Sequence, residues 1–235
     1  MIKLKLELFT DGSSFIDDDI RASASSFAIY ISDRMIKEGT EFYEKGTNNL
    51  AEASAILIAM NEIDKMVDRV DEKFKKDGVY IDVYADSLNT VETCRDWIYK
   101  WLKRARKGVL YNSSGEVVAN QEIFKEIHKN YLTSDKFIMK FYHINSHKID
   151  FKIYKDYLKE IKYYFVNRHK DPDLALDIPE DIYTNKKFKE AKETFYKKNK
   201  IKIEDEELLR LLIYNKHVDK LAGDCLDENL EKYLE

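Results

Sequence analysis

Two aspartates directly follow segments with the alternating pattern of a β-strand. Ile2, Leu4, Leu6 and Leu8 alternate with charged residues in a segment that runs to Thr10, just before Asp11. Residues 79–85 alternate valine, isoleucine and alanine with tyrosine and aspartate up to Asp86. Aspartate after a strand is commonly a turn or capping residue, and residues 11–14 have the composition of a turn. Alternatively, the two carboxylates meet at one sheet edge, where they offer the hard oxygen ligands that Mg2+ requires.

Two further carboxylates lie in helical patterns. Glu52 shares an i, i+4, i+8 row with Ile56 and Met60, so the pattern places it on a buried helix face. A buried carboxylate must be paired, bind a metal ion or become neutral. The alternative is a helix rotated by one position, with Glu52 at the solvent edge near the positive N-terminus. The same two explanations apply to Asp219, which we expect in the first turn of the last helix.

The hydrophobic pattern predicts the elements that must position these acids. The expected strands are 2–10, 26–32, 35–43, 79–85 and 137–144, the first three as an antiparallel meander. The expected helices are 48–67, 88–104, 121–131 and 218–234, with amphipathic stretches at 149–166, 185–199 and 204–214. Thr47 or Asn48 is the expected N-cap of the first helix. This alternation is typical of an α/β layer fold.

Composition bounds the class of protein. The chain has 235 residues, 44% hydrophobic and 36% charged, which predicts a globular chain and excludes a disordered or collagen-like one. Seven glycines and two prolines leave no obvious linker, so we expect one domain with an addition. The net charge of −4 argues against a generally basic surface that wraps nucleic acid.

The cysteines and the N-terminus bear on the compartment. Cys94 and Cys225 are too few for a disulfide framework and lack metal-ligand spacing, which favours a reducing environment. Residues 1–7 carry charges where a signal peptide would be apolar, and no apolar run reaches the length of roughly 18 residues that a membrane span needs. We therefore expect a cytoplasmic monomer that makes no contact with a membrane.

Taken in order, four segments resemble ribonuclease H of type 1. They are Phe9-Thr10-Asp11-Gly12-Ser13, Gly46-Thr47-Asn48-Asn49-Leu50-Ala51-Glu52, Ala85-Asp86-Ser87 and Asn215-Lys216-His217-Val218-Asp219-Lys220-Leu221-Ala222. The resemblance covers residues 1–147 and 215–235, and it implies a catalytic domain with the ribonuclease H-like α/β fold, a mixed five-stranded sheet flanked by helices. Residues 148–214 are then a helical insertion of unknown role before the last acid.

The resemblance implies a metal-dependent endonuclease that hydrolyses the RNA strand of RNA/DNA hybrids. By carry-over, Asp11, Glu52, Asp86 and Asp219 would hold two Mg2+ ions, for which Mn2+ can substitute. The products would carry 5′-phosphate and 3′-hydroxyl ends.

The resemblance also singles out a histidine. His147, in Ile144-Asn145-Ser146-His147, is similar to the family's mobile histidine, which would assist proton movement or the release of product and metal. His143 and His217 are nearby competitors for this role, and a lone histidine near a strand end is commonly structural.

Two groups of residues are implied in nucleic-acid binding. The first comprises Gly12, Thr47, Asn48 and Asn49, of which the last three would reach the DNA phosphate and the RNA minor groove, although helix capping is the simpler role. The second is similar to the family's basic protrusion and comprises Lys100, Trp101, Lys103, Arg104, Arg106 and Lys107. Its five cations have no acid between them, whereas a solvated helix face usually mixes both signs.

Three features depart from the family pattern, of which one is Leu88, which follows Asp86-Ser87 where many members carry a polar side chain. A short loop would normally join His147 to Asp219, whereas here residues 148–214 intervene. Their near-neutral charge favours decoration or a protein partner, although the basic stretch 186–202 could bind a nucleic-acid backbone. The acidic run Asp17-Asp18-Asp19 would repel phosphate if it lay near the first acid.

Two other functions stay open. One is a structure-specific DNA nuclease, because one fold hosts many chemistries. The other is a non-catalytic hybrid-binding module, against which the full set of acids speaks, since a pure binder gains nothing from crowding four like charges.

Overall fold

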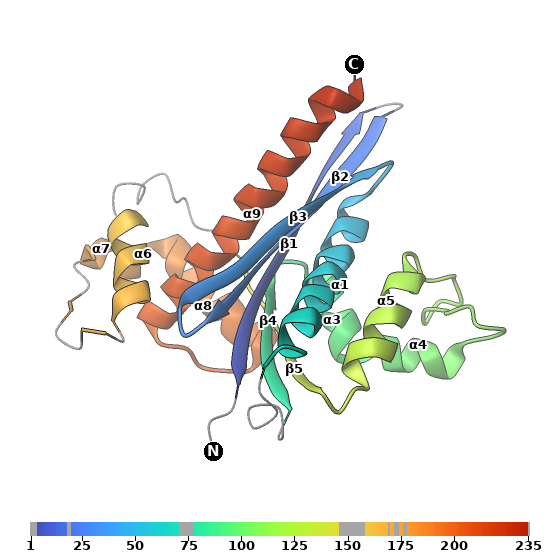
Figure 1. Cartoon of the computed structure of the whole chain (residues 1–235), viewed down its shortest axis with the longest axis horizontal. Coiled ribbons are helices and arrows are strands. Elements are labelled where there is room, and N and C mark those ends of the chain that lie inside the picture. The colour runs from blue at the N-terminus through green and yellow to red at the C-terminus, as the bar shows by residue number, and fades with distance from the viewer. Residues whose placement is uncertain are drawn as a thin grey trace.

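A computed structural model describes residues 4–17, 20–70, 78–145, 158–168, 170–171, 174–175 and 178–234. Its five strands form one sheet in the order β3-β2-β1-β4-β5 (Figure 1). Their bounds are β1 Lys5–Asp17, β2 Ile20–Ile31, β3 Arg34–Glu44, β4 Val79–Ala85 and β5 Phe137–His143. β1, β2 and β3 pair antiparallel, whereas β4 lies parallel to both β1 and β5. The predicted mixed five-stranded sheet with an opening meander is confirmed.

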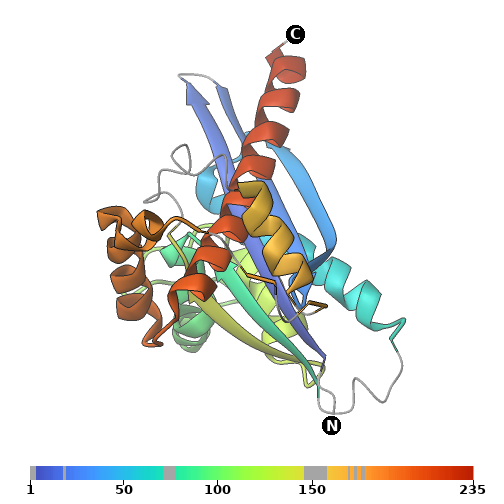
Figure 2. The same cartoon turned by 90° about the vertical axis from the view of Figure 1, so that its left-hand side faces the viewer.

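Helices cover both faces of this sheet (Figures 1 and 2). On one face lie α1 Asn48–Val67, α3 Leu88–Glu92, the π-helical segment Thr93–Trp97, α4 Ile98–Arg104, α5 Gln121–Ile127 and a second π-helical segment, His128–Leu132. The other face is covered by α6 Leu158–Asn167, α7 Glu180–Thr184, α8 Lys186–Asn199 and α9 Asp205–Leu234. In the described residues, no helix is both long and apolar enough to cross a membrane.

The alternating side chains of β1 serve two separate cores. Leu6 and Leu8 are buried against Ile56 of α1, whereas Phe9 belongs to the core on the opposite face. The Phe9 ring stacks on Tyr84 with 4.9 Å between the ring centroids. Residues from α6 to α9 complete this second core, so the described part of 148–214 is an integral layer of the molecule and not a decoration.

A buried ionic cluster joins α9 to the sheet. The Arg210 side chain of α9 donates to both carboxylate oxygens of Glu7 at 2.7 Å and to Asp33 Oδ1 at 2.8 Å. Arg168, just after α6, binds the other oxygen of Asp33 at 3.1 Å. Asp33 lies in the turn between β2 and β3, so this cluster ties both helices to the same sheet edge.

Two predicted boundaries are wrong. The turn at 11–14 does not form, because β2 pairs with β1 as far as Asp17↔Ile20 and keeps the strand extended. The last helix begins at Asp205, since the leucines of its first turns are buried in the second core. Asp219 therefore lies in the middle of α9, away from the positive N-terminus, and the predicted domain boundary at 214/215 falls inside one helix. The division of the chain into catalytic domain and insertion stays a prediction.

Candidate active site

Asp11 and Asp86 are brought together by parallel strand pairing. The last pair between β1 and β4 is Thr10↔Ala85; Asp11 is the next residue of β1, and Asp86 directly follows the end of β4. Asp11 is 4% exposed, and burial together with the charge of Asp86 raises its pKa well above the usual range. The N–H of Gly12 donates to Asp11 Oδ1 at 2.7 Å and opposes that rise.

Glu52 lies in the first turns of α1, on its buried side. It is 9% exposed, so the solvent-edge alternative is wrong. Asn48 donates to Glu52 Oε1 at 2.6 Å, and the Thr90 hydroxyl lies 3.5 Å from Oε2. Burial raises the pKa of Glu52 to about 7; a hydrogen bond from Ser87 opposes this, and the charge of Asp86 adds to it.

Gly12 allows β1 to approach the start of α1. A Cβ at this position would lie 2.6 Å from the backbone nitrogen of Glu52 and 2.9 Å from Ala51 Cβ. Both distances are too short for any side chain without a backbone shift. Gly12 is thus required for the juxtaposition of Asp11 and Glu52, whether or not it also touches nucleic acid.

Asp219 joins the group from the opposite face of the sheet. Its charge is among those that raise the pKa of Asp11, and its carboxylate forms an ion pair with Lys216, one turn earlier in α9. Lys216 is therefore a neighbour of the site that sequence reasoning missed. Helical i, i+3 spacing was the available signal.

The four predicted acids form one electrostatic cluster. Among the described residues, no three metal-ligating side chains already stand as a ready-made metal site. The donor chemistry nevertheless fits a divalent ion. The cluster consists of carboxylate oxygens, and a bound cation would stabilise the ionised forms that burial disfavours at Asp11 and Glu52.

The structure describes two of the three candidate histidines. His147 lies outside the described residues. His143 is 5% exposed and burial lowers its pKa, while His217 Nε2 lies 2.7 Å from Glu38 of β3. The functional role of His147 stays a prediction.

Asp17, the first residue of the acidic run, lies away from the other acids. Asp17 ends β1 six residues beyond Asp11, which at the rise of a strand is about 20 Å. Asp18 and Asp19 lie outside the described residues. The repulsion expected between this run and phosphate at the first acid therefore does not apply to Asp17.

The start of α1 combines capping with access to a cleft. Thr47 is the N-cap, and its hydroxyl accepts from the Leu50 N–H at 3.3 Å, as predicted. Asn48 is engaged with Glu52, and Asn49 lines the neighbouring cleft. Asn49 thus faces a hollow of the surface.

That cleft has a volume of about 350 Å³ and separates α1 from the helices after β4. Its lining includes Asn49, Asn89, Thr90, Trp97, Trp101 and Asn112. Thr90 also contacts Glu52, so the cleft adjoins the carboxylates. The sequence analysis missed Asn89, Trp97 and Asn112; Trp97 stands four residues before Trp101, a helical spacing that could have identified it.

The basic residues of α4 and of the turn that follows it differ in the contacts that they already make within the protein. Lys100 forms an ion pair with Asp96, one turn earlier, so the predicted run of five cations includes one with an acidic partner. Arg106 lies over the ring of Tyr111, 5.9 Å from its centroid. Lys103, Arg104 and Lys107 are exposed. Trp101 is half-buried and packs edge-on against Phe124.

Comparison with known proteins identifies the family. The RNase H family model matches residues 3–152. Among curated proteins no match is found. Similar solved structures include a foamy viral protease-reverse transcriptase in complex with dsDNA (14% identity, 58% of this chain and 79% of that chain, TM-score 0.45). A second is LC9-RNase H1, a type 1 RNase H with the type 2 active-site motif (13% identity, 61% of this chain and 64% of that chain, TM-score 0.45). A third is LC11-RNase H1 isolated from compost (18% identity, 61% of this chain and 86% of that chain, TM-score 0.42). Because its model covers more than half of the sequence, this chain belongs to the RNase H family of nucleases, which generally use divalent metal ions.

Proposed function

We propose that this protein is an endonuclease that hydrolyses the RNA strand of RNA/DNA hybrids. The observation that carries the proposal is that the charges of Asp86 and Asp219 act on the buried Asp11 and the charge of Asp86 acts on the buried Glu52, beside a cleft with two tryptophans, in a chain of the RNase H family. A pure binding module would have no use for this concentration of negative charge.

The four acids Asp11, Glu52, Asp86 and Asp219 would hold two Mg2+ ions, with Mn2+ able to replace them. Bound ions would supply Lewis-acid activation of the scissile phosphate and of the attacking water. The products would then carry 5′-phosphate and 3′-hydroxyl ends. The ion pair between Lys216 and Asp219 would have to break when the Asp219 carboxylate binds a metal ion.

The chain's own residues keep these acids in position. Asn48 and Thr90 orient the carboxylate of Glu52, and Gly12 lets β1 approach α1 closely enough for Asp11 to share the site. Without a cation the site repels a phosphodiester, because the substrate and the acids have the same sign of charge. Substrate binding and metal binding are therefore coupled.

The cleft beside α4 would receive the DNA strand of the hybrid. Trp97 and Trp101 offer apolar surfaces for sugars, and Lys103 and Arg104 lie exposed on the same helical segment to bind phosphates. At the start of α1, Asn49 would approach the RNA minor groove, where a 2′-hydroxyl distinguishes RNA from DNA.

A strand-resolved cleavage assay tests this function. Labelled RNA/DNA, DNA/DNA and RNA/RNA duplexes are incubated with Mg2+ or Mn2+, using the parent protein and Asp86→Asn. We expect only the RNA of the hybrid to be cut, and the variant to be inactive. Equal cutting of the DNA duplex would identify a DNA nuclease instead, and tight hybrid binding without cleavage would identify a binding module.

A further inference from the structure

The end of α8 is bonded to the edge of the central sheet. The Asn199 side chain accepts from the His143 N–H at 2.9 Å and donates to the His143 carbonyl at 2.8 Å. Because β5 is an edge strand, this amide takes the two backbone bonds that another strand would make. The last residue of α8 is thereby fixed to the strand that flanks β4.

Arg95 reinforces this junction from the other face of the sheet. Its guanidinium donates to the Phe141 carbonyl, to the Lys198 carbonyl at 3.1 Å and to Asn199 Oδ1 at 2.6 Å. Arg95 lies in the π-helical segment that leads directly into α4. One side chain therefore connects the helix of the tryptophan cleft, the edge strand and the end of α8.

The junction stands next to the carboxylate cluster. His143 pairs with Ala85, the residue before Asp86. Burial is the largest cause that lowers the pKa of His143. The neighbouring groups Asp86, Lys198 and Arg95 also affect this pKa. Lys198 is thus close to the same strand ends that present the acids. Figure 2 shows the orange α8 at the margin of the sheet, apart from the red α9.

Exposed cations gather at this end of α8. Lys197, Lys198 and Lys200 are all exposed, and Lys197 is paired with Glu193. Lys198 and Lys200 make no ion pair with any other residue that the structure describes. Cations near a helix C-terminus are favoured by the helix dipole alone. The helix dipole does not explain the two hydrogen bonds that fix the end of α8 to His143, next to the strand end that carries Asp86.

We propose that the C-terminal end of α8 binds the phosphate backbone of the hybrid next to the cleaved phosphate, through Lys198 and Lys200. The proposal rests on the proposed function. α4 packs with the core on one face of the sheet and α8 with the core on the other, and the end of α8 is bonded to His143, which pairs with the residue before Asp86. Two anchored contacts would hold a duplex in one register over the acids, which a single contact would leave able to pivot. They also offset the repulsion between the acids and phosphate.

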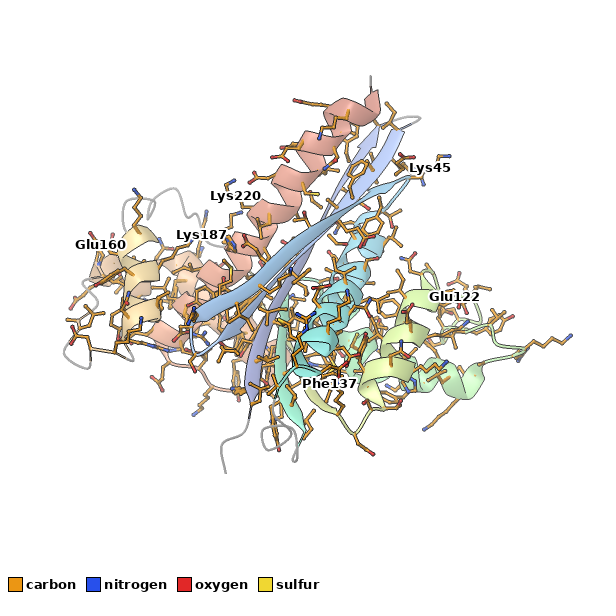
Figure 3. All side chains as sticks on the ribbon, in the orientation of Figure 1. Lys45, Glu122, Phe137, Glu160, Lys187 and Lys220 are labelled. Atoms are coloured by element: carbon orange, nitrogen blue, oxygen red, sulfur yellow. The ribbon has the colours of Figure 1, made fainter. Side chains whose placement is uncertain are left out.

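The test compares two double variants of the same helix. Lys198→Ala with Lys200→Ala removes the proposed contact, whereas Lys187→Ala with Lys189→Ala removes two exposed lysines near the start of α8, where Figure 3 labels Lys187. Affinity for an RNA/DNA hybrid is measured over a salt series in an Asp86→Asn background, so that no cleavage interferes.

We expect the first pair to weaken binding roughly three- to tenfold and to lower the slope of log affinity against log salt by about 1.5 to 2, because two phosphate contacts are lost. The control pair should leave the slope unchanged. Equal slopes for both double variants would overturn the proposal. Hybrid cleavage by the same variants without the Asp86 substitution is measured in parallel, so a failure of the proposed function is recognised independently of this result.

Discussion

At the scale of single residues, burial raises the pKa of the Glu52 carboxyl group and so favours its neutral form. Its pKa of about 7 in the folded protein lies above the ordinary value of 4.5. The folded state therefore binds the proton more tightly than the unfolded chain. In the metal-free protein, this contribution to the free energy of unfolding is fully present below pH 4.5 and is lost as the pH rises to about 7.

Glu52→Gln should accordingly flatten the pH dependence of stability. Across that window we expect the metal-free parent to lose about 3 kcal/mol more than the variant. Asp11 contributes in the same direction, so some dependence persists. Urea unfolding at pH 5 and pH 8 without divalent ions measures the effect, with the exposed Glu122→Gln on α5 as control (Figure 3). Parallel curves for parent and Glu52→Gln would contradict the assigned pKa.

Replacement of two glycines by alanine should change the stability of the protein in opposite directions. Gly12→Ala places a Cβ against the backbone of Glu52, and we expect a loss of about 1–3 kcal/mol in stability together with reduced activity. Gly223→Ala, inside α9, meets no atom within 4 Å and should stabilise the protein by up to about 1 kcal/mol. Chemical denaturation of both variants tests this. An unaffected Gly12→Ala protein would mean that β1 and α1 are not so close.

At the scale of elements, Arg210 holds α9 against the sheet through Glu7 and Asp33. Arg210→Met would leave buried carboxylates without their partner, and we expect a loss of about 3–5 kcal/mol. Lys220→Ala on the same helix, which breaks only an exposed pair with Asp224, should cost less than about 1 kcal/mol (Figure 3). Urea denaturation compares the two variants. Similar losses would show that the cluster does not anchor the helix.

Elements with strong local signals could be predicted from the sequence. The bounds of α1 and β4 follow from a capping threonine and from strict alternation, and both are confirmed. The ends of β1 and α9 could not be predicted, because distant residues determine them. β2 extends β1 through Gly12 and Ser13, and the second core extends α9 backwards to Asp205.

At the scale of the whole molecule, average composition obscures how charge is distributed. The net charge of −4 argues against a generally basic surface, yet the described residues place exposed cations on α4 and at the end of α8. The placement of the described residues between 158 and 214 could not be predicted either. It depends on pairs such as Arg210 with Glu7 and Asn199 with His143, which are 203 and 56 residues apart in the chain.

If four carboxylates act together on a hybrid, Asp219 is the most informative one to replace, because its place in the site depends on the whole fold. Asp224 on the same helix is an exposed control. We predict that Asp219→Asn abolishes Mg2+-dependent cutting of the RNA strand, while Asp224→Asn retains the parent rate. Undiminished cleavage by Asp219→Asn, with its folding unchanged, would contradict the account.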